Sequence, residues 1–284
     1  MLASNWVLGK VFDWHGASVR WDRIGTGGPV VLCHGTPWSS YVWRTAVQTL
    51  SAERTVYVWD MIGYGQSDKP AGDVSLGEQG RLLAALLEHW DLEAPDLVAH
   101  DYGGAVTLRA HLLHGVSVRS LALVDVVALS PWGSPFFRLV AQHPDVFTQL
   151  PPNLHEALVR AYIAGASHRG LSPGVHDALV SPWLGTEGKA AFYRQIAQAD
   201  QRYTDEIEPL YSQIGVPTLI VWGTADDWIP VDRAQQLHHL IPGSRIELID
   251  DAGHLVQEDR PTELCLMLHR WLIERMGERI EAGR

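Results

Sequence analysis

The sequence predicts an α/β fold in which a mostly parallel sheet carries helices on both of its faces. Two observations predict it. Short apolar runs alternate with helical segments between residues 30 and 126 and again from residue 217, the pattern of parallel strands connected by helices. Apolar residues make up 46% of the 284 residues and charged residues 19%, which is enough apolar side chain to bury one large core.

The opening residues predict an antiparallel hairpin at the edge of the sheet. Trp6–Trp14 and Ala17–Ile24 have the pattern of strands, and His15-Gly16 between them is a turn signal. After a turn at residues 25–29, Val30–Cys33 has the continuous apolar character of a buried parallel strand. The elements expected next are a helix at Ser39–Ser51, a strand at Val56–Asp60, a helix at Leu76–Trp90, a strand at Asp96–Ala99, a helix at Gly103–Leu113 and a strand at Leu121–Val126.

Residues 129–213 are predicted to form a helical cap inserted into one core domain. This stretch has helical patterns, no clear strand and half of the chain's 16 prolines. The α/β pattern then resumes, so residues 1–128 and 214–284 are expected to build the same sheet, with the cap lying over it as a lid. The closing elements expected are a strand at Pro217–Trp222, a helix at Ala234–Leu240, a strand at Arg245–Ile249 and a long helix from Leu255 to about Met276.

The charge and cysteine content exclude several classes of protein. Lys and Arg number 22 and Asp and Glu 33, and the formal net charge of −11 argues against nucleic acid or an anionic membrane as partner. Cys33 and Cys265 lie in apolar runs without a spacing motif, so neither a disulfide framework nor a cysteine zinc site is expected. No signal peptide pattern and no run of 18 apolar residues is visible, so we expect a soluble, cytoplasmic protein.

The residues that follow each strand are the candidates for chemistry, because ligands bind beyond the carboxyl ends of open parallel sheets. The strand at Asp96–Ala99 is followed by His100-Asp-Tyr-Gly-Gly104 and then by a helix. The two glycines permit a sharp turn that holds the Asp101 side chain out at the top of the sheet. This is the geometry of a nucleophile elbow, G-x-S-x-G, with Asp in place of Ser. An ordinary turn with Asp101 as a helix N-cap is the alternative.

Two further strand ends favour the catalytic interpretation of Asp101. The segment Trp222-Gly-Thr-Ala-Asp226 places a carboxylate four residues beyond one strand, and His254 follows the next strand. Nucleophile, acid and histidine, in that chain order, form a known catalytic triad on α/β sheets. We therefore predict Asp101 as nucleophile, Asp226 as acid and His254 as base. Asp125, at the end of another strand, is the alternative acid.

The segment Cys33-His-Gly-Thr-Pro37 also follows a strand. Its His-Gly step leaves backbone N–H groups available, so the amides of Thr36 and Tyr102 are predicted to form an oxyanion hole. The chain contains no G-x-G-x-x-G, no phosphate-binding P-loop and no H-E-x-x-H motif, so neither a cofactor nor a metal is expected.

With these motifs the chain resembles the α/β-hydrolase superfamily, and within it the branch that uses an aspartate nucleophile. The resemblance covers nearly all of the chain outside residues 129–213. The segments that carry the resemblance are His34–Arg44, Asp60–Pro70, His100–Gly104, Trp222–Asp226 and Ala252–His254. The first two look most like haloalkane dehalogenases, and the third looks as much like epoxide hydrolases.

The resemblance implies hydrolysis at saturated carbon. A carboxylate displaces a halide or opens an epoxide to give an alkyl ester of Asp101, and His254, held by Asp226, then activates water against that ester. The substrate is expected to be a small apolar organic molecule, with water as the second reactant. The haloalkane reaction is the first candidate and epoxide opening the alternative. A non-catalytic small-molecule-binding protein of the same fold is a third candidate, and the oligomeric state stays open.

The leaving group separates the first two candidates. Haloalkane dehalogenases bind halide with a Trp directly after the nucleophile and with a second Trp or Asn, and the corresponding positions here hold Tyr102 and Thr36. Epoxide hydrolases use lid tyrosines instead, and the segment around Tyr193 resembles one that carries such a residue. The residues expected to contact substrate are Trp38, Tyr162, Trp183 and Tyr193.

Overall fold

The computed structural model describes residues 6–282 of the protein, and these residues contain one eight-stranded sheet. The strand order is β1-β2-β4-β3-β5-β6-β7-β8. The first two strands form an antiparallel hairpin, β2 pairs antiparallel with β4, and all other pairs are parallel, which confirms the predicted fold class. The strands are β1 (Lys10–Trp14), β2 (Ala17–Ile24), β3 (Gly28–Cys33), β4 (Arg54–Trp59), β5 (Asp96–His100), β6 (Ser120–Val124), β7 (Thr218–Gly223) and β8 (Arg245–Ile249).

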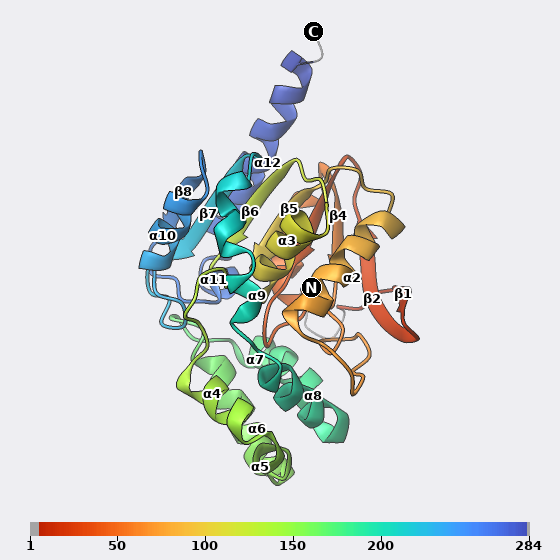
Figure 1. The fold of residues 1–284 in the computed structure, drawn as a ribbon, viewed down its shortest axis with the longest axis vertical. Coiled ribbons are helices and arrows are strands. Elements are labelled where there is room, and N and C mark those ends of the chain that lie inside the picture. The colour runs from red at the N-terminus through yellow and green to blue at the C-terminus, as the bar shows by residue number, and fades with distance from the viewer. Residues whose placement is uncertain (1–5, 283–284) are drawn as a thin grey trace.

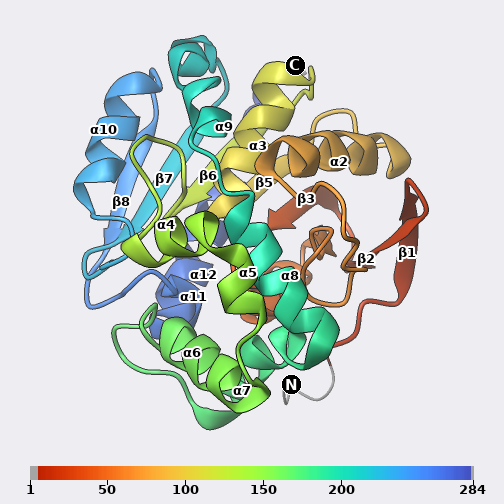
Figure 2. The same cartoon turned by 60° about the horizontal axis from the view of Figure 1, so that its bottom comes forward.

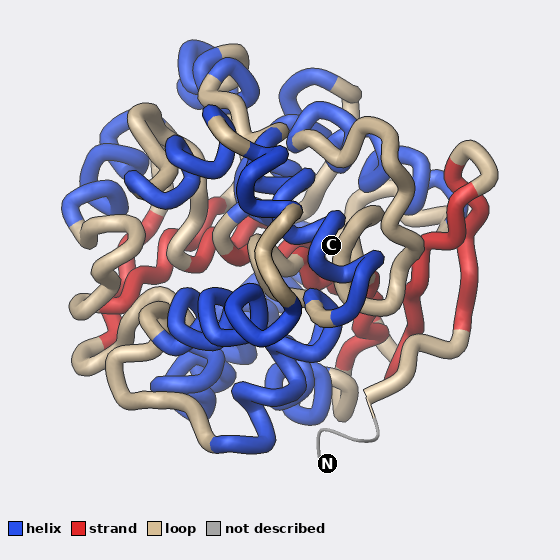
Figure 3. Tube along the Cα trace, turned by 90° about the horizontal axis from the view of Figure 1, so that it is seen from below, coloured by secondary structure: helices blue, strands red, loops and turns tan. Residues whose placement is uncertain are grey.

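Helices cover both faces of the sheet. On one face α2 (Leu76–His89) packs against α3 (Tyr102–Leu113) (Figure 1), and on the other α1 (Arg44–Leu50) packs against α12 (Pro261–Ala282). Seen along a perpendicular direction, the strands form a band between helices (Figure 3). All residues of the central strands β5 and β6 are buried, which is why these strands are apolar throughout instead of alternating.

Two predicted helices are each divided in the structure. The first begins as the 3₁₀ turn η2 (Ser40–Trp43), capped by the Ser39 hydroxyl, and continues as α1. The last begins as α11 (Val256–Asp259), and α12 starts anew at Pro261. Proline has no amide hydrogen and clashes with the preceding turn, so it starts a helix more readily than it continues one. The remaining helix of the core is α10 (Asp232–Leu240).

Between β6 and β7 the described chain contains helices and no strand. The helices between residues 135 and 197 lie beyond the carboxyl ends of the parallel strands, on the side opposite to the end of α12, and the chain from residue 202 runs back alongside the sheet (Figures 1 and 2). The helices are α4 (Pro135–Gln142), α5 (Pro144–Thr148), α6 (Pro152–Ala164), α7 (Pro173–Val180), η3 (Ser181–Trp183), α8 (Gly185–Ala197), α9 (Arg202–Asp205) and η4 (Glu208–Gln213). No helix in residues 6–282 is both long enough and apolar enough to cross a bilayer.

Strand register brings the predicted site together. Cys33 pairs with Ala99, His100 with Val124, and Val124 lies beside Val221. The loops after β3, β5, β6 and β7 therefore start at one level of the sheet, and β8 adds its own loop beside β7. Side chains separated by more than a hundred residues in sequence can meet there.

Candidate active site

Asp101 stands alone between β5, which ends at His100, and α3, which begins at Tyr102. Its backbone has φ 50° and ψ −122°, a conformation that L-residues rarely adopt. Such strain costs of order 1–3 kcal/mol and is common at functional sites. The turn also needs a glycine at position 103, because a Cβ there would lie 2.6 Å from the carbonyl oxygens of Cys33 and His34.

The buried Asp101 carboxylate has a different partner for each oxygen. Oδ1 accepts a hydrogen bond of 2.5 Å from the Thr36 amide. Oδ2 lies 3.2 Å from Nε2 of His254, close enough for an ion pair but without the alignment of a hydrogen bond. Gly35 makes this approach possible, since a Cβ at that position would overlap the carboxylate. One oxygen therefore faces an amide donor and the other faces the imidazole.

The His254 ring joins Asp101 to Asp226. Its Nδ1 donates to Asp226 Oδ2 at 2.9 Å, and Asp226 Oδ1 accepts from the amides of Trp228 and Ile229 at 2.7 and 2.9 Å. These bonds orient the ring so that Nε2 faces Asp101. The structure thus brings the three predicted triad residues into one chain of contacts. Asp125 makes no contact with the His254 ring among the described hydrogen bonds and ion pairs; its Oδ1 accepts from the Gly223 amide.

The two carboxylates control the charge of His254. Burial alone would lower its pKa, but Asp226 and Asp101 outweigh burial and hold the pKa well above its usual value. The neighbouring His100 behaves in the opposite way, because burial lowers its pKa to about 3 and keeps it neutral. Neutral His100 donates from Nε2 to the backbone carbonyl of His254 at 2.9 Å. The two carboxylates therefore favour the imidazolium form of His254 in the resting site.

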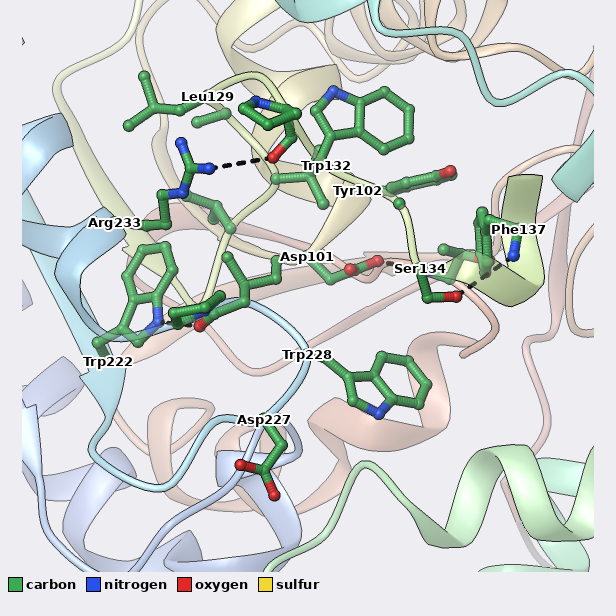
Figure 4. Close-up of a pocket in the computed structure, with 18 of the residues that line it drawn as sticks. Asp101, Tyr102, Leu129, Trp132, Ser134, Phe137, Trp222, Asp227, Trp228 and Arg233 are labelled. Carbon is green, nitrogen blue, oxygen red and sulfur yellow. Dashed lines mark hydrogen bonds between the residues drawn. The ribbon is translucent and has the colours of Figure 1, made fainter. Parts of the chain in front are cut away.

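A cavity of about 270 Å³ opens on Asp101. Cavities of about 150 Å³ hold a benzene molecule, so this one admits a somewhat larger organic molecule. In Figure 4 the Asp101 carboxylate lies between Tyr102 and Trp132 on one side and Trp228 on the other. The wall is mainly apolar and includes Val126, Leu129, Trp132, Phe137, Tyr162, Trp222, Trp228 and Leu237.

Two tyrosines line the cavity beside the nucleophile. The Tyr102 hydroxyl is buried and has no hydrogen-bond partner among the described residues. The Tyr162 ring stacks on Trp228, which in turn stacks on His254, with ring centroids 4.6 and 5.1 Å apart. Burial, followed by the nearby Asp101 charge, raises the pKa of Tyr162, and burial also raises that of Tyr102. Both phenols therefore stay protonated and can act as hydrogen-bond donors.

The other predicted substrate contacts lie outside the cavity wall. Tyr193 places its hydroxyl 2.9 Å from Nδ1 of His155, whose Nε2 lies 2.8 Å from the Trp183 carbonyl. The Trp183 indole donates to the carbonyl of Pro37 at 2.8 Å. The donors of Tyr193 and Trp183 are thus engaged within the protein. Trp38 is buried behind Trp228, with its ring stacked 5.7 Å away.

The predicted oxyanion amides differ in their present partners. The Thr36 amide already donates to Asp101, whereas the Tyr102 amide belongs to the first turn of α3 and has no acceptor within its helix. The Thr36 hydroxyl points elsewhere: it donates to Oε1 of Gln195 on α8 at 2.8 Å, and the Tyr64 hydroxyl donates to the same oxygen at 3.0 Å. A side chain of the inserted helices therefore holds the loop that carries Thr36.

Sequence reasoning missed Trp228, Gln195 and Asp259 as parts of the site; the Asp259 carboxylate accepts from the amide of Gly253, the residue before His254, at 2.7 Å. Trp228 follows Asp226 by two residues, and an aromatic residue so close to a predicted acid was a usable signal. Gln195 and Asp259 carry no motif, and only the folded chain shows what they contact. Among the side chains of residues 6–274, no group of three or more His, Cys, Asp and Glu residues is arranged to hold a metal ion.

Comparison with known proteins agrees with this fold. A family model described as "alpha/beta hydrolase fold" matches residues 28–261. A crystal structure of an α/β hydrolase fold protein from Burkholderia ambifaria is 46% identical, with a TM-score of 0.91, over 93% of this chain and 97% of that one.

Two curated relatives are similar at lower identity. Haloalkane dehalogenase 2 of Mycobacterium tuberculosis is 26% identical over 94% of each chain. A 2-hydroxy-6-oxo-2,4-heptadienoate hydrolase of Pseudomonas putida is 28% identical over 88% of this chain and 91% of the relative. The chain is a hydrolase, and it belongs to the α/β-hydrolase fold family.

Proposed function

We propose that this hydrolase cleaves its substrate through a covalent alkyl ester on Asp101, and that the bond it breaks joins saturated carbon to halogen. The observation that carries the proposal is the Asp101 carboxylate, held in the cavity between the Thr36 amide and the His254 imidazole. An aspartate that capped a helix would instead accept from an amide of that helix, and Asp101 makes no such bond to α3. The N-cap alternative therefore has no support.

A carboxylate at this position suits displacement at saturated carbon. If it attacked a carboxylic ester, the product would be a reactive anhydride, whereas attack on an alkyl carbon gives a stable ester. Asp101 Oδ2 attacks the carbon, the carbon–halogen bond breaks, and its electron pair leaves with the halide. Asp101 Oδ1 becomes the carbonyl oxygen of the new ester and already faces the Thr36 amide.

Water then cleaves the ester. Once Asp101 is esterified, His254 keeps Asp226 as its only carboxylate partner among the described contacts and gives up its extra proton more easily. Neutral Nε2 removes a proton from water, the oxygen attacks Cγ of Asp101, and negative charge develops on Oδ1 between the amides of Thr36 and Tyr102. Collapse breaks the Cγ–Oδ2 bond, His254 returns its proton to Oδ2 so that the alcohol leaves with that oxygen, and one oxygen of water stays on Asp101.

The Tyr102 hydroxyl is the donor that we assign to the departing halide. It is buried, lines the cavity next to Asp101 and has no partner among the described residues. A donor without a protein acceptor is favourably placed for an anion that forms only during reaction. The 26% identity to a haloalkane dehalogenase supports halide as the leaving group.

Epoxide opening is the second candidate, and the Tyr162 hydroxyl favours it. Tyr162 and Tyr102 both line the cavity beside Asp101, so two phenols could donate to an epoxide oxygen. Their protonated state suits general acid catalysis. An epoxide keeps its oxygen in the product, so the two candidates give enzyme adducts of different mass.

Mass spectrometry of a trapped ester tests both candidates. His254→Ala lacks the base, so the alkyl ester on Asp101 should accumulate during incubation with a panel of bromoalkanes and epoxides. A bromoalkane adds its alkyl group without bromine, and an epoxide adds its whole mass. Asp101→Asn is the matched control, since it keeps the shape of the side chain and removes the nucleophile. If no member of the panel modifies the peptide that contains Asp101, the proposed covalent mechanism is wrong.

A further inference from the structure

A second carboxyl group, that of Asp125, lies next to the acid of the triad. Asp125 follows β6 directly and is fully buried. Its Oδ1 accepts a hydrogen bond of 2.9 Å from the Gly223 amide. Its Oδ2 is buried and accepts a hydrogen bond from none of the described residues. None of the ion pairs among the described side chains includes Asp125, so one amide is its only donor.

Gly223 connects the two carboxyl groups. Its amide donates to Asp125, and its carbonyl accepts from the Asp226 amide at 3.3 Å. Asp226 accepts three hydrogen bonds, from Trp228, Ile229 and His254. A carboxylate offers about four acceptor positions, so Asp226 keeps one for a further donor.

Two buried, ionised carboxylates cannot share this place without a second cation. The titratable groups that face Asp125 are Asp226, in the loop after β7, and His254, in the loop after β8. The single positive charge of His254 already lies between Asp226 and Asp101. Burial first, and the Asp226 charge second, raise the pKa of Asp125 well above its usual value.

We propose that Asp125 is a neutral carboxylic acid that donates its Oδ2 proton to Asp226 and so keeps that carboxylate turned toward His254. Asp125 is then a positioning residue, because it touches neither substrate nor the reacting atoms. The donated proton accounts for both the unpartnered Oδ2 and the fourth acceptor position of Asp226. The effect of Asp125 on turnover rests on the function proposed above, but the protonation state of Asp125 does not.

Infrared difference spectroscopy of the folded protein without substrate tests the protonation state. At neutral pH an exposed carboxylate is ionised, so a carbonyl band of a protonated carboxylic acid in the parent must come from a buried group. Asp125→Asn should remove that band, and Asp250→Asn, which alters an exposed carboxylate, should leave it. If the parent has no such band, or if Asp125→Asn keeps it, the proposal is overturned whatever the substrate proves to be.

Two variants then test the donation to Asp226. Asn at position 125 keeps an oxygen for the Gly223 amide and an N–H for Asp226, whereas Leu keeps neither. Asp125→Leu should slow hydrolysis of the ester on Asp101 by about tenfold to a hundredfold, the equivalent of one hydrogen bond to a charged group. It should also move the acid limb of the pH–rate profile of ester hydrolysis to higher pH. Without its donor, Asp226 raises the pKa of His254 further, and the step needs neutral His254.

If the Asn amide replaces the donor, Asp125→Asn should hydrolyse the ester on Asp101 at a rate within about threefold of the parent, a difference close to the usual error of such comparisons. The acid limb of its pH–rate profile should be unchanged. Both variants are compared with the parent at equal folded fraction, as measured by circular dichroism. If Asn and Leu slow the step equally, or if Leu leaves the acid limb where it is, the donation to Asp226 is overturned even when the infrared band is present.

Discussion

Gly253, the residue before His254, donates a hydrogen bond of 2.7 Å from its amide to the Asp259 carboxylate. The same carboxylate accepts from the amides of His168 and Arg169 at 2.9 and 3.1 Å and from the hydroxyl of Ser167 at 2.5 Å. Residues 167–169 follow α6 in the inserted helices. Asp259 therefore joins the loop that carries the imidazole to the segment that follows α6.

Asp259→Asn should destabilise the protein by about 1–3 kcal/mol, the cost of leaving buried polar groups unsatisfied. The new NH₂ group faces amide donors where an oxygen accepted from them before, so at least one hydrogen bond is lost and a donor meets a donor. Urea unfolding followed by circular dichroism measures the loss. Asp250→Asn is the control, because this exposed side chain should change stability by less than about 0.5 kcal/mol.

Ser167→Ala distinguishes the hydroxyl hydrogen bond to Asp259 from the three amide hydrogen bonds. It removes one of the four donors and leaves the amides in place, so the expected loss is about 0.5–1.5 kcal/mol. A loss as large as that of Asp259→Asn would show that the amide hydrogen bonds do not hold the His254 loop.

The sheet and the three triad candidates could be predicted from the sequence because they depend on local signals. Strand ends, glycines and chain order place Asp101, Asp226 and His254 at one edge of a parallel sheet. Their contacts in the structure agree with that order, although their catalytic roles stay predictions. The apolar run at β5 and the glycine pair after it were visible because a buried strand and a sharp turn each restrict composition.

The contacts of the inserted helices could not be predicted in the same way. Tyr193 lies on α8 and its partner His155 on α6, 38 residues apart, and no spacing rule connects the two. The sequence showed a tyrosine that resembled a lid donor, but the hydrogen bond to His155 depends on how two helices cross. The contacts of Asp259 and Gln195 could not be predicted for the same reason, because their partners Ser167 and Thr36 lie far away in the sequence.

Replacing a tyrosine by phenylalanine should slow epoxide opening at Tyr102 and Tyr162, which line the cavity, and not at Tyr193, which does not. Tyr102→Phe should slow epoxide opening by about 10²–10⁴, the usual contribution of a positioned acid, because an alkoxide leaves poorly without a proton. Bromide displacement needs no proton and should fall much less. Tyr193→Phe should change neither rate appreciably, since its hydroxyl faces His155.

The amount of ester formed on Asp101 in the first turnover measures both rates. Tyr162→Phe serves as a second cavity variant and should reduce only the epoxide reaction. A large loss of rate in Tyr193→Phe, together with an unchanged rate in Tyr102→Phe, would assign the proton donor to Tyr193 instead.

The two chemical steps should depend differently on pH. Asp226 and Asp101 raise the pKa of His254 in the resting site, and esterification removes the Asp101 charge, so the pKa falls in the alkyl-enzyme. Ester hydrolysis needs neutral His254, so its rate should rise with pH through this lowered pKa and then level off. Alkylation needs no proton transfer to or from His254, so its rate should stay flat over the same range. Rapid-quench measurement of the ester resolves the steps, and a pH-independent hydrolysis step would exclude His254 as its base.

Gln195→Leu tests whether the inserted helices position the oxyanion loop. Gln195 accepts hydrogen bonds from the hydroxyls of Thr36 and Tyr64, and leucine leaves both buried donors unsatisfied. Losing an oxyanion donor completely costs about 10²–10³ in rate, so a displaced Thr36 amide should slow ester hydrolysis by about tenfold to a hundredfold.

Gln195→Glu keeps an acceptor for both hydroxyls and should recover most of the rate in this comparison. Alkylation should change little in either variant, because negative charge develops on Oδ1 of Asp101 only when water attacks the ester. The ratio of the two rate constants, measured by rapid quench, is therefore the decisive quantity. If Gln195→Leu slows alkylation and hydrolysis by the same factor, Gln195 supports the shape of the cavity as a whole and does not position the Thr36 amide.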